Sequence, residues 1–224
     1  KILIIDNRFV SERVNQIRNW NMEFIHGDIL DKNLVNKYFS NADVVHHLAG
    51  ITSVPKTKSE SSKEIDEKIK LVAEEGTQNI LNTISNECKL IFPSTHVVYE
   101  GISEVRKDIK EDEATQPILS YSSSKAANEK QLRDSGKNYV ILRLGSVYGY
   151  SNDTMRIDIM PNLFSKIASQ NGTLKLFAAG RQIKSMVPLV DVARCFKFIE
   201  ESDHIKSELF NITKDTLTVK EVAQ

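Results

Sequence analysis

A tyrosine and a lysine four residues apart, Tyr121 and Lys125, carry the clearest chemistry in the sequence. Residues with this spacing lie on the same face of a helix. A free tyrosine has a pKa of about 10, but a neighbouring ammonium group stabilises the phenolate and lowers that pKa. Such a pair can exchange a proton with an alcohol or a carbonyl group. On spacing alone, however, a tyrosine that caps the helix and a lysine that faces solvent are the commoner explanation.

The elements that must position this pair follow from the apolar pattern, in which short β-branched runs alternate with longer amphipathic segments. Strands are expected at 1–5, 22–25, 42–48, 89–92, 139–144, 174–177, 186–189 and 209–212. Helices are expected at 31–39, 59–81, 122–135, 161–169 and 191–201, with a further helix starting at 219. Alternating strands and helices predict an α/β fold with a doubly wound parallel sheet. In such sheets, ligands bind at the carboxyl ends of the strands.

The composition excludes several classes of protein. The 224 residues include 30 Lys and Arg against 30 Asp and Glu, so the net charge of zero gives no reason to expect binding to nucleic acid or to an acidic membrane. No apolar run approaches the roughly 20 residues that a membrane span requires. Two cysteines, Cys88 and Cys195, make neither a disulfide framework nor a metal site, which favours a cytoplasmic setting.

Longer motifs surround the tyrosine and lysine. The segment 117–129 reads P-I-L-S-Y-S-S-S-K-A-A-N-E, preceded by F-P-S-T-H-V-V-Y at 92–99 and followed by R-L-G-S-V-Y-G at 143–149. Further matches are H-L-A-G at 47–50, G-T-Q-N at 76–79 and Q-I-K-S-M-V-P-L-V-D-V-A at 182–193. In this order and spacing, the motifs resemble the extended short-chain dehydrogenase/reductase family, in particular its NAD-dependent nucleotide-sugar epimerase/dehydratase branch.

This resemblance implies catalytic roles. Tyr121 matches the acid/base of the family, and Lys125 matches its partner, which in the family also bonds the nicotinamide ribose. Thr95 matches the third catalytic hydroxyl, with Ser94 as the second choice; either hydroxyl could instead belong to an ordinary strand-end turn. Thr95 and Tyr121 are 26 residues apart, a spacing typical of the extended branch.

The resemblance also implies an NAD site. An acidic residue at the end of the strand, Asp6, would bond the adenosine ribose and repel a 2′-phosphate, which favours NAD over NADP. The alternative is a strand-end aspartate that starts a turn. The residues expected to contact the cofactor are Asp6, Asn7, Asp28, Ile29, Leu48, Ala49, Gly50, Pro93, Tyr121, Lys125 and Leu144.

Expected substrate contacts are Ser94, Thr95, Ser146 and Lys184. Lys184 stands where the family often has an arginine that grips a diphosphate, and a lysine can bind phosphate as a point charge. Both Ser146 and Lys184 are equally compatible with ordinary surface or turn positions. The sequence also departs from the family: Thr95-His96-Val97 replaces the T-D-E of the 4,6-dehydratases, which argues against that reaction, and Glu100 replaces a glycine.

We therefore expect a Rossmann-like NAD-binding domain at 1–150 and a smaller mixed α/β substrate-binding part at 151–224. The expected activity is epimerisation of a nucleotide-diphosphate sugar at C4 through a transient 4-keto intermediate. The alternatives are an NAD(P)-dependent keto-sugar or carbonyl reductase or a dehydratase of the same family, and a non-catalytic nucleotide-binding member. The family also favours a homodimer.

The sequence contains only 9 glycines and no G-x-G, so the glycine-rich turn of a dinucleotide-binding domain is not visible. The family places that turn after its first strand, directly before the strand that ends in Asp6. The expectation is therefore a chain that lacks the first strand and this turn, together with some C-terminal residues.

Overall fold

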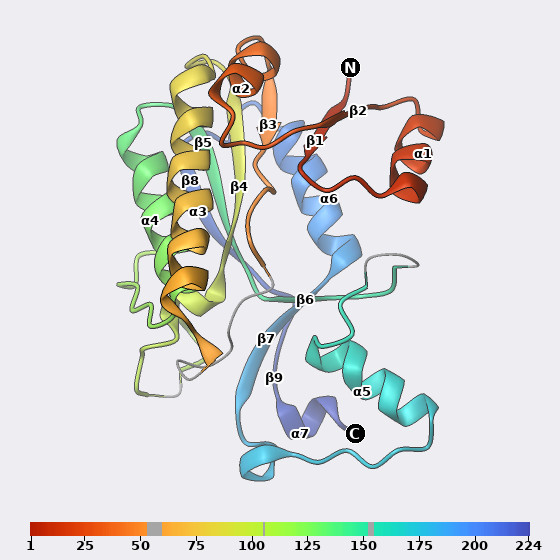
Figure 1. The fold of residues 1–224 in the computed structure, drawn as a ribbon. Helices are drawn as coiled ribbons and strands as arrows, with labels where there is room; N and C mark the ends of the chain where they lie inside the picture. The colour runs from red at the N-terminus through yellow and green to blue at the C-terminus, as the bar shows by residue number, and fades with distance from the viewer. Residues whose placement is uncertain (53–59, 105, 152–154) are drawn as a thin grey trace. The chain divides into compact units, whose positions relative to one another are not determined.

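Strands and helices alternate along the chain in the computed structural model, which describes residues 1–52, 60–104, 106–151 and 155–224 (Figure 1). The chain forms two compact units. Unit 1 consists of Lys1–Cys88 and Leu119–Lys137, and unit 2 of Lys89–Ile118 and Asn138–Gln224. These units are defined by packing, so the division into cofactor and substrate domains at residue 150 stays a prediction.

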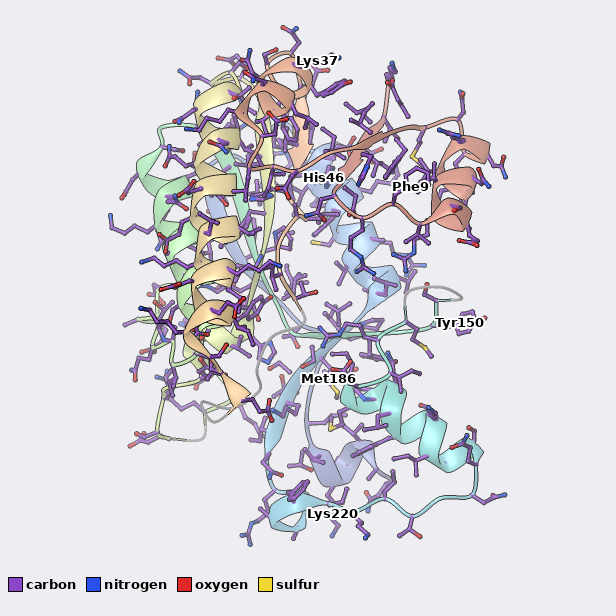
Figure 2. The ribbon with its side chains drawn as sticks, in the orientation of Figure 1. Phe9, Lys37, His46, Tyr150, Met186 and Lys220 are labelled. Atoms are coloured by element: carbon purple, nitrogen blue, oxygen red, sulfur yellow. The ribbon has the colours of Figure 1, made fainter. Side chains whose placement is uncertain are left out.

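Unit 1 pairs two parallel strands and packs two long helices against each other. Its strands are β1 (Leu3–Asp6), β2 (Glu23–His26) and β3 (Val44–His46), and its helices are α1 (Ser11–Asn19), α2 (Lys32–Phe39), α3 (Lys63–Thr83) and α4 (Ser120–Asp134). In the parallel pair β1 and β2, Asp6 lies opposite His26. Helices α3 and α4 lie side by side (Figure 1). Phe9, which follows β1, packs edge-on against Phe24 and His26 (Figure 2).

Local capping explains where the helices of unit 1 begin. The Asp31 carboxylate accepts hydrogen bonds from the backbone N–H groups of Asn33 and Leu34, which otherwise have no partner at the start of α2. The Ser62 hydroxyl accepts a bond from Ile65 at the start of α3. The expected helix 59–81 therefore begins at Lys63, and residue 59 lies outside the described residues.

Unit 2 contains two sheets. The first is parallel, in the order β4 (Lys89–Thr95), β5 (Asn138–Leu144) and β8 (Glu208–Ile212). The second joins β6 (Ser146–Tyr148) in parallel to β7 (Ile183–Pro188), which pairs antiparallel with β9 (Asp215–Thr218). Val140, Ile141 and Leu142 of β5 are fully buried, as is typical of a parallel strand that is covered on both faces. The parallel pairs confirm the α/β class that the sequence predicts.

Helices and turns complete unit 2. They are the turn η2 (His96–Tyr99), helix α5 (Met160–Ser169), the turn η3 (Phe177–Gly180), helix α6 (Leu189–Glu200) and the short α7 (Val219–Val222). Met186 of β7 is buried in this unit (Figure 2).

One expected strand of unit 2 is wrong. Residues 174–176 form no strand, and Phe177, which begins the turn η3, is 86% exposed. The next residues, Ala178 and Ala179, have left-handed backbone angles with φ of 47° and 54°, which turn the chain away from an extended path. The short strands β6 and β9, in contrast, are absent from the sequence-based expectation.

A buried lysine donates hydrogen bonds to backbone carbonyls at the C-terminal end of α6. Lys89, on β4, is only 6% exposed, and its ammonium donates to the backbone carbonyls of Ile199 and Ser202 at 2.9 and 2.7 Å. Each carbonyl also accepts a backbone N–H, from Ser202 and Ile205 respectively, and a positive charge is favourable at the C-terminus of a helix.

We expect Lys89→Met to lower the free energy of unfolding by about 2 kcal/mol, because the two carbonyls lose a charged donor inside the protein. Urea denaturation measures this loss. The exposed Lys206 provides the control, since Lys206→Met should change the free energy by less than about 0.5 kcal/mol. Equal effects of the two substitutions would contradict the role of Lys89.

Candidate active site

The tyrosine and lysine lie on α4 in the expected arrangement. The helix starts at Ser120, where the Ser122 hydroxyl bonds both the backbone N–H and the carbonyl of Leu119, at 3.2 and 2.9 Å. Tyr121 and Lys125 are therefore one helical turn apart on one face, and both are half-buried. Their roles in catalysis stay a prediction.

Burial and a buried carboxylate set the charge of Lys125. Removal from water lowers the pKa of Lys125 from its ordinary value of 10.5 to about 8, although the Glu129 carboxylate raises it. Glu129 follows Lys125 by one turn of α4 and is fully buried. Lys125 is thus close to releasing its proton near neutral pH, while the nearby carboxylate favours its charged form.

A buried polar network lies next to Lys125 and was not predicted as part of the site. The Nε2 atom of His47 is 2.8 Å from the Thr77 hydroxyl, and the Asn128 side chain donates to the same hydroxyl at 3.1 Å and to the Ala73 carbonyl at 2.9 Å. Burial, and then the charge of Lys125, lowers the pKa of His47 to about 3. His47 is therefore neutral at physiological pH.

The expected adenosine end of the cofactor site lies at the carboxyl ends of β1 and β2. Asp6 is exposed, and its carboxylate accepts a bond from the backbone N–H of Arg8 at 2.8 Å. The Asn7 side chain donates to Asp28 at 2.9 Å, so the structure brings these two expected contacts together. Ile29 differs: it is buried against Gly76 of α3, and its carbonyl accepts a bond from Asn79.

The segment after β3 offers an open surface. Leu48, Ala49 and Gly50 are all exposed, and a Cβ atom at Gly50 would meet no other atom within 4 Å. The backbone at Gly50 is therefore open to close approach by a ligand.

In unit 2, the expected catalytic hydroxyl lies at the end of β4. Thr95 is buried, and its hydroxyl oxygen accepts a bond from the Val97 N–H at 3.3 Å, which leaves its proton available for a ligand. Ser94 is buried as well, and Pro93 is half-buried. Beside Thr95 in the register, Leu144 ends β5, and its carbonyl lies 3.0 Å from Nδ1 of His96.

The expected diphosphate contact lies near the same strand ends. Lys184, on β7, is exposed, and its charge contributes to lowering the pKa of His96, for which burial is the main cause. Ser146 is half-buried on β6, opposite Met186 of β7. Lys184 and His96 are therefore near each other. Thr95 belongs to unit 2, and the pair of Tyr121 and Lys125 belongs to unit 1.

A model of the NAD dependent epimerase/dehydratase family matches residues 1–213. The chain belongs to this family. It is 28% identical to a UDP-N-acetyl-α-D-glucosaminuronate decarboxylase of Bacillus cytotoxicus, a match that covers 100% of this chain and 70% of the relative. It is also 28% identical to a CDP-paratose 2-epimerase of Salmonella typhi, over 86% of this chain and 64% of the relative.

The fold of this chain is similar to that of a UDP-glucose 4-epimerase. The crystal structure of the UDP-glucose 4-epimerase of Thermotoga maritima with UDP-glucose matches with a TM-score of 0.80 and 24% identity, over 99% of this chain and 72% of the other. This likeness confirms the Rossmann-like fold. The family is one of NAD-dependent enzymes that act on nucleotide sugars, as the motifs predict.

The residues present fit NAD. The exposed carboxylate of Asp6 can accept hydrogen bonds from ribose hydroxyls, and the open surface at Gly50 admits a ligand against the backbone. The half-buried ammonium of Lys125 can donate to a second ribose. Among the described residues, no group of His, Cys, Asp or Glu could hold a metal ion, and no helix is long and apolar enough to cross a membrane.

We expect Asp6→Asn to weaken NAD binding by about tenfold, because a neutral amide forms weaker hydrogen bonds to ribose hydroxyls than a carboxylate does. The preference for NAD over NADP should fall as well, since the negative charge that repels a 2′-phosphate is gone. Titration calorimetry with each dinucleotide measures both effects. Glu12→Gln, on α1, makes the same chemical change away from the strand end and should leave both affinities unchanged.

Proposed function

We propose that this protein is an NAD-dependent epimerase that inverts C4 of a nucleotide-diphosphate sugar. The observation that carries the proposal is the pairing of Tyr121 and Lys125 on one face of α4, with the buried Glu129 one turn further on. The fold shared with a UDP-glucose 4-epimerase supports the same reaction.

In the proposed reaction, residues of the chain take one proton from the sugar C4 hydroxyl and later return it. The phenolate of Tyr121 accepts the proton of the sugar C4 hydroxyl, and the Lys125 ammonium stabilises that phenolate. The Thr95 hydroxyl would donate to the C4 oxygen, and Lys184 would attract the diphosphate. When bound, NAD supplies the reversible acceptance of the C4 hydride. After the 4-keto sugar has rotated to present its opposite face, Tyr121 returns the proton to the C4 oxygen.

Dehydration is disfavoured by the residues next to Thr95. Removal of water from a 4-keto sugar needs an acid and a base, and His96-Val97 stand where the dehydratases carry Asp-Glu. Burial lowers the pKa of His96, which disfavours the protonated ring that an acid would need.

Decarboxylation is the second candidate, because the matching decarboxylase of Bacillus cytotoxicus aligns with the whole chain. Both candidate reactions can begin with proton removal by Tyr121. They differ in the substrate: decarboxylation requires a sugar with a carboxylate at C6 and releases carbon dioxide. Net reduction of a keto-sugar would instead consume one NADH for each product.

A panel of UDP-, dTDP-, GDP- and CDP-sugars, each with and without a C6 carboxylate, tests the proposal. We expect a C4 epimer of at least one sugar, seen by NMR, without net formation of NADH. A pentose product with release of carbon dioxide would favour decarboxylation instead. No epimer and no keto product from any sugar would refute the proposed reaction.

A further inference from the structure

The loop 100–118 joins the strand that carries Thr95 to the helix that carries Tyr121. Backbone hydrogen bonds close its base: the Gly101 N–H donates to the Gln116 carbonyl, and the Gln116 N–H donates to the Val98 carbonyl, both at 2.8 Å. A Cβ atom at Gly101 would approach the Gln116 carbonyl oxygen to 2.5 Å, so the two ends of the loop are in close contact. The long connection therefore starts and ends at nearly the same place.

The far part of this loop is also held. Arg143, buried on β5, donates to the Tyr99 hydroxyl and to the Glu111 carbonyl. The Tyr99 hydroxyl donates to the Lys110 carbonyl at 3.1 Å, and the Glu111 carboxylate accepts the Asn211 N–H at 2.7 Å. These bonds fix Lys110 and Glu111 to β5 and β8 independently of the last residues of the loop.

The end of the loop is held by a side chain as well. The Glu100 carboxylate accepts a hydrogen bond from the backbone N–H of Ile118 at 2.7 Å. Glu100 lies five residues after Thr95, and Ile118 lies three residues before Tyr121. Through this bond, only eight residues of chain separate two hydroxyls that are 26 residues apart in sequence.

We propose that Glu100 is a positioning residue for Tyr121: its carboxylate holds the backbone N–H of Ile118, three residues before Tyr121 on the chain that leads into α4. This inference rests on the proposed function, which gives Thr95 and Tyr121 a shared substrate atom. The family's usual glycine could not make the bond, so the positioning is a property of this chain.

The first residue of α4, Ser120, is also held by a hydrogen bond within unit 1. The role of Glu100 can therefore be tested by substitution without loss of the helix. The Ser120 hydroxyl, and then the Ser61 hydroxyl, bond to Asp66 on α3 and lower its pKa. Because Asp66 and the two backbone bonds remain, loss of the Glu100 side chain should shift the start of α4 without unfolding the protein.

The test compares Glu100→Ala, Glu100→Gln and the control Glu104→Ala in the full chain. Glu104 is an exposed residue of the same loop, so its replacement removes the same charge. Glu100→Ala should lower kcat on the converted sugar by about tenfold with little change in KM, since a small displacement of an acid/base reduces the chemical step. Glu100→Gln keeps an oxygen acceptor and should recover kcat to within about threefold of the wild type. Glu104→Ala should match the wild type.

Amide hydrogen exchange at Ile118 and Ser123 gives a readout that does not depend on turnover. Both amides should exchange faster in Glu100→Ala than in Glu104→Ala. Unchanged exchange, an unchanged kcat in Glu100→Ala, or no recovery in Glu100→Gln would each overturn the inference. If the wild type converts no sugar, the proposed function fails, and the exchange rates alone decide whether Glu100 holds the start of α4.

Discussion

Tyr121→Phe should lower kcat by about a thousandfold, because the substitution removes the only atom of this side chain that can carry a proton. The phenyl ring keeps its place on α4, so the free energy of unfolding should change by less than about 1 kcal/mol. NAD binding should persist, since Asp6 and the open surface at Gly50 are untouched. Steady-state kinetics on the converted sugar and calorimetric titration with NAD measure the two effects.

The control for this substitution is Tyr38→Phe, which removes a hydroxyl from α2. It should retain wild-type turnover. If Tyr121→Phe retained turnover as well, Tyr121 would not be the acid/base. If neither the wild type nor any variant converted a sugar while NAD still bound, the non-catalytic alternative would be favoured.

Lys125→Met should abolish turnover and also stabilise the protein. Turnover should fall by at least about a hundredfold, because the phenolate of Tyr121 loses its neighbouring charge. Stability should rise by about 1 to 3 kcal/mol at pH 7, because the partly buried ammonium is costly even with Glu129 nearby, as its lowered pKa indicates. Loss of function with gain of stability is typical of a residue retained for catalysis.

The sign of the pH dependence follows from the same pKa. Folding lowers the pKa of Lys125 to about 8, so between about pH 8 and 10.5 the unfolded chain binds more protons than the folded one. The free energy of unfolding should therefore gain a contribution from Lys125 as the pH rises through this window, and Lys125→Met should lack it. Urea denaturation from pH 7 to 10 measures the slope.

The control for Lys125→Met is Lys130→Met, which removes an exposed lysine from the same helix. It should leave both turnover and the pH slope unchanged. A Lys125→Met protein that is less stable than the wild type at pH 7 would contradict the cost assigned to the buried charge.

Much of the fold could be predicted because its signals are local. The β-branched run before Asp6 and the capping aspartate Asp31 each determine an element within a few residues. The expected strand 174–177 is wrong although Leu174 and Leu176 alternate with exposed residues, because left-handed backbone at Ala178 and Ala179 follows it and apolar alternation carries no information on that turn. The strands β6 and β9 are short, and each is defined by its partner β7.

The candidate site also contains residues that the sequence predicts and contacts that it does not. Helical spacing identified Tyr121 and Lys125, and the fully buried Glu129 continues that spacing by one more turn. The bonds of His47 to Thr77 and of Asn128 to Thr77 join residues 30 and 51 positions apart, and their partners depend on how α3 and α4 pack. The bond from Ile118 to Glu100 spans a loop that has no regular period. Spacing along a sequence cannot show such contacts.

In the proposed reaction, a hydride leaves C4 of the sugar and the same hydride returns to the opposite face. The most direct test uses the sugar that the panel identifies, synthesised with deuterium at C4, and follows the deuterium by NMR during turnover. We expect the C4 epimer to retain the deuterium, without net formation of NADH. Loss of deuterium to solvent, formation of one NADH for each product, or the absence of any C4 epimer would contradict it.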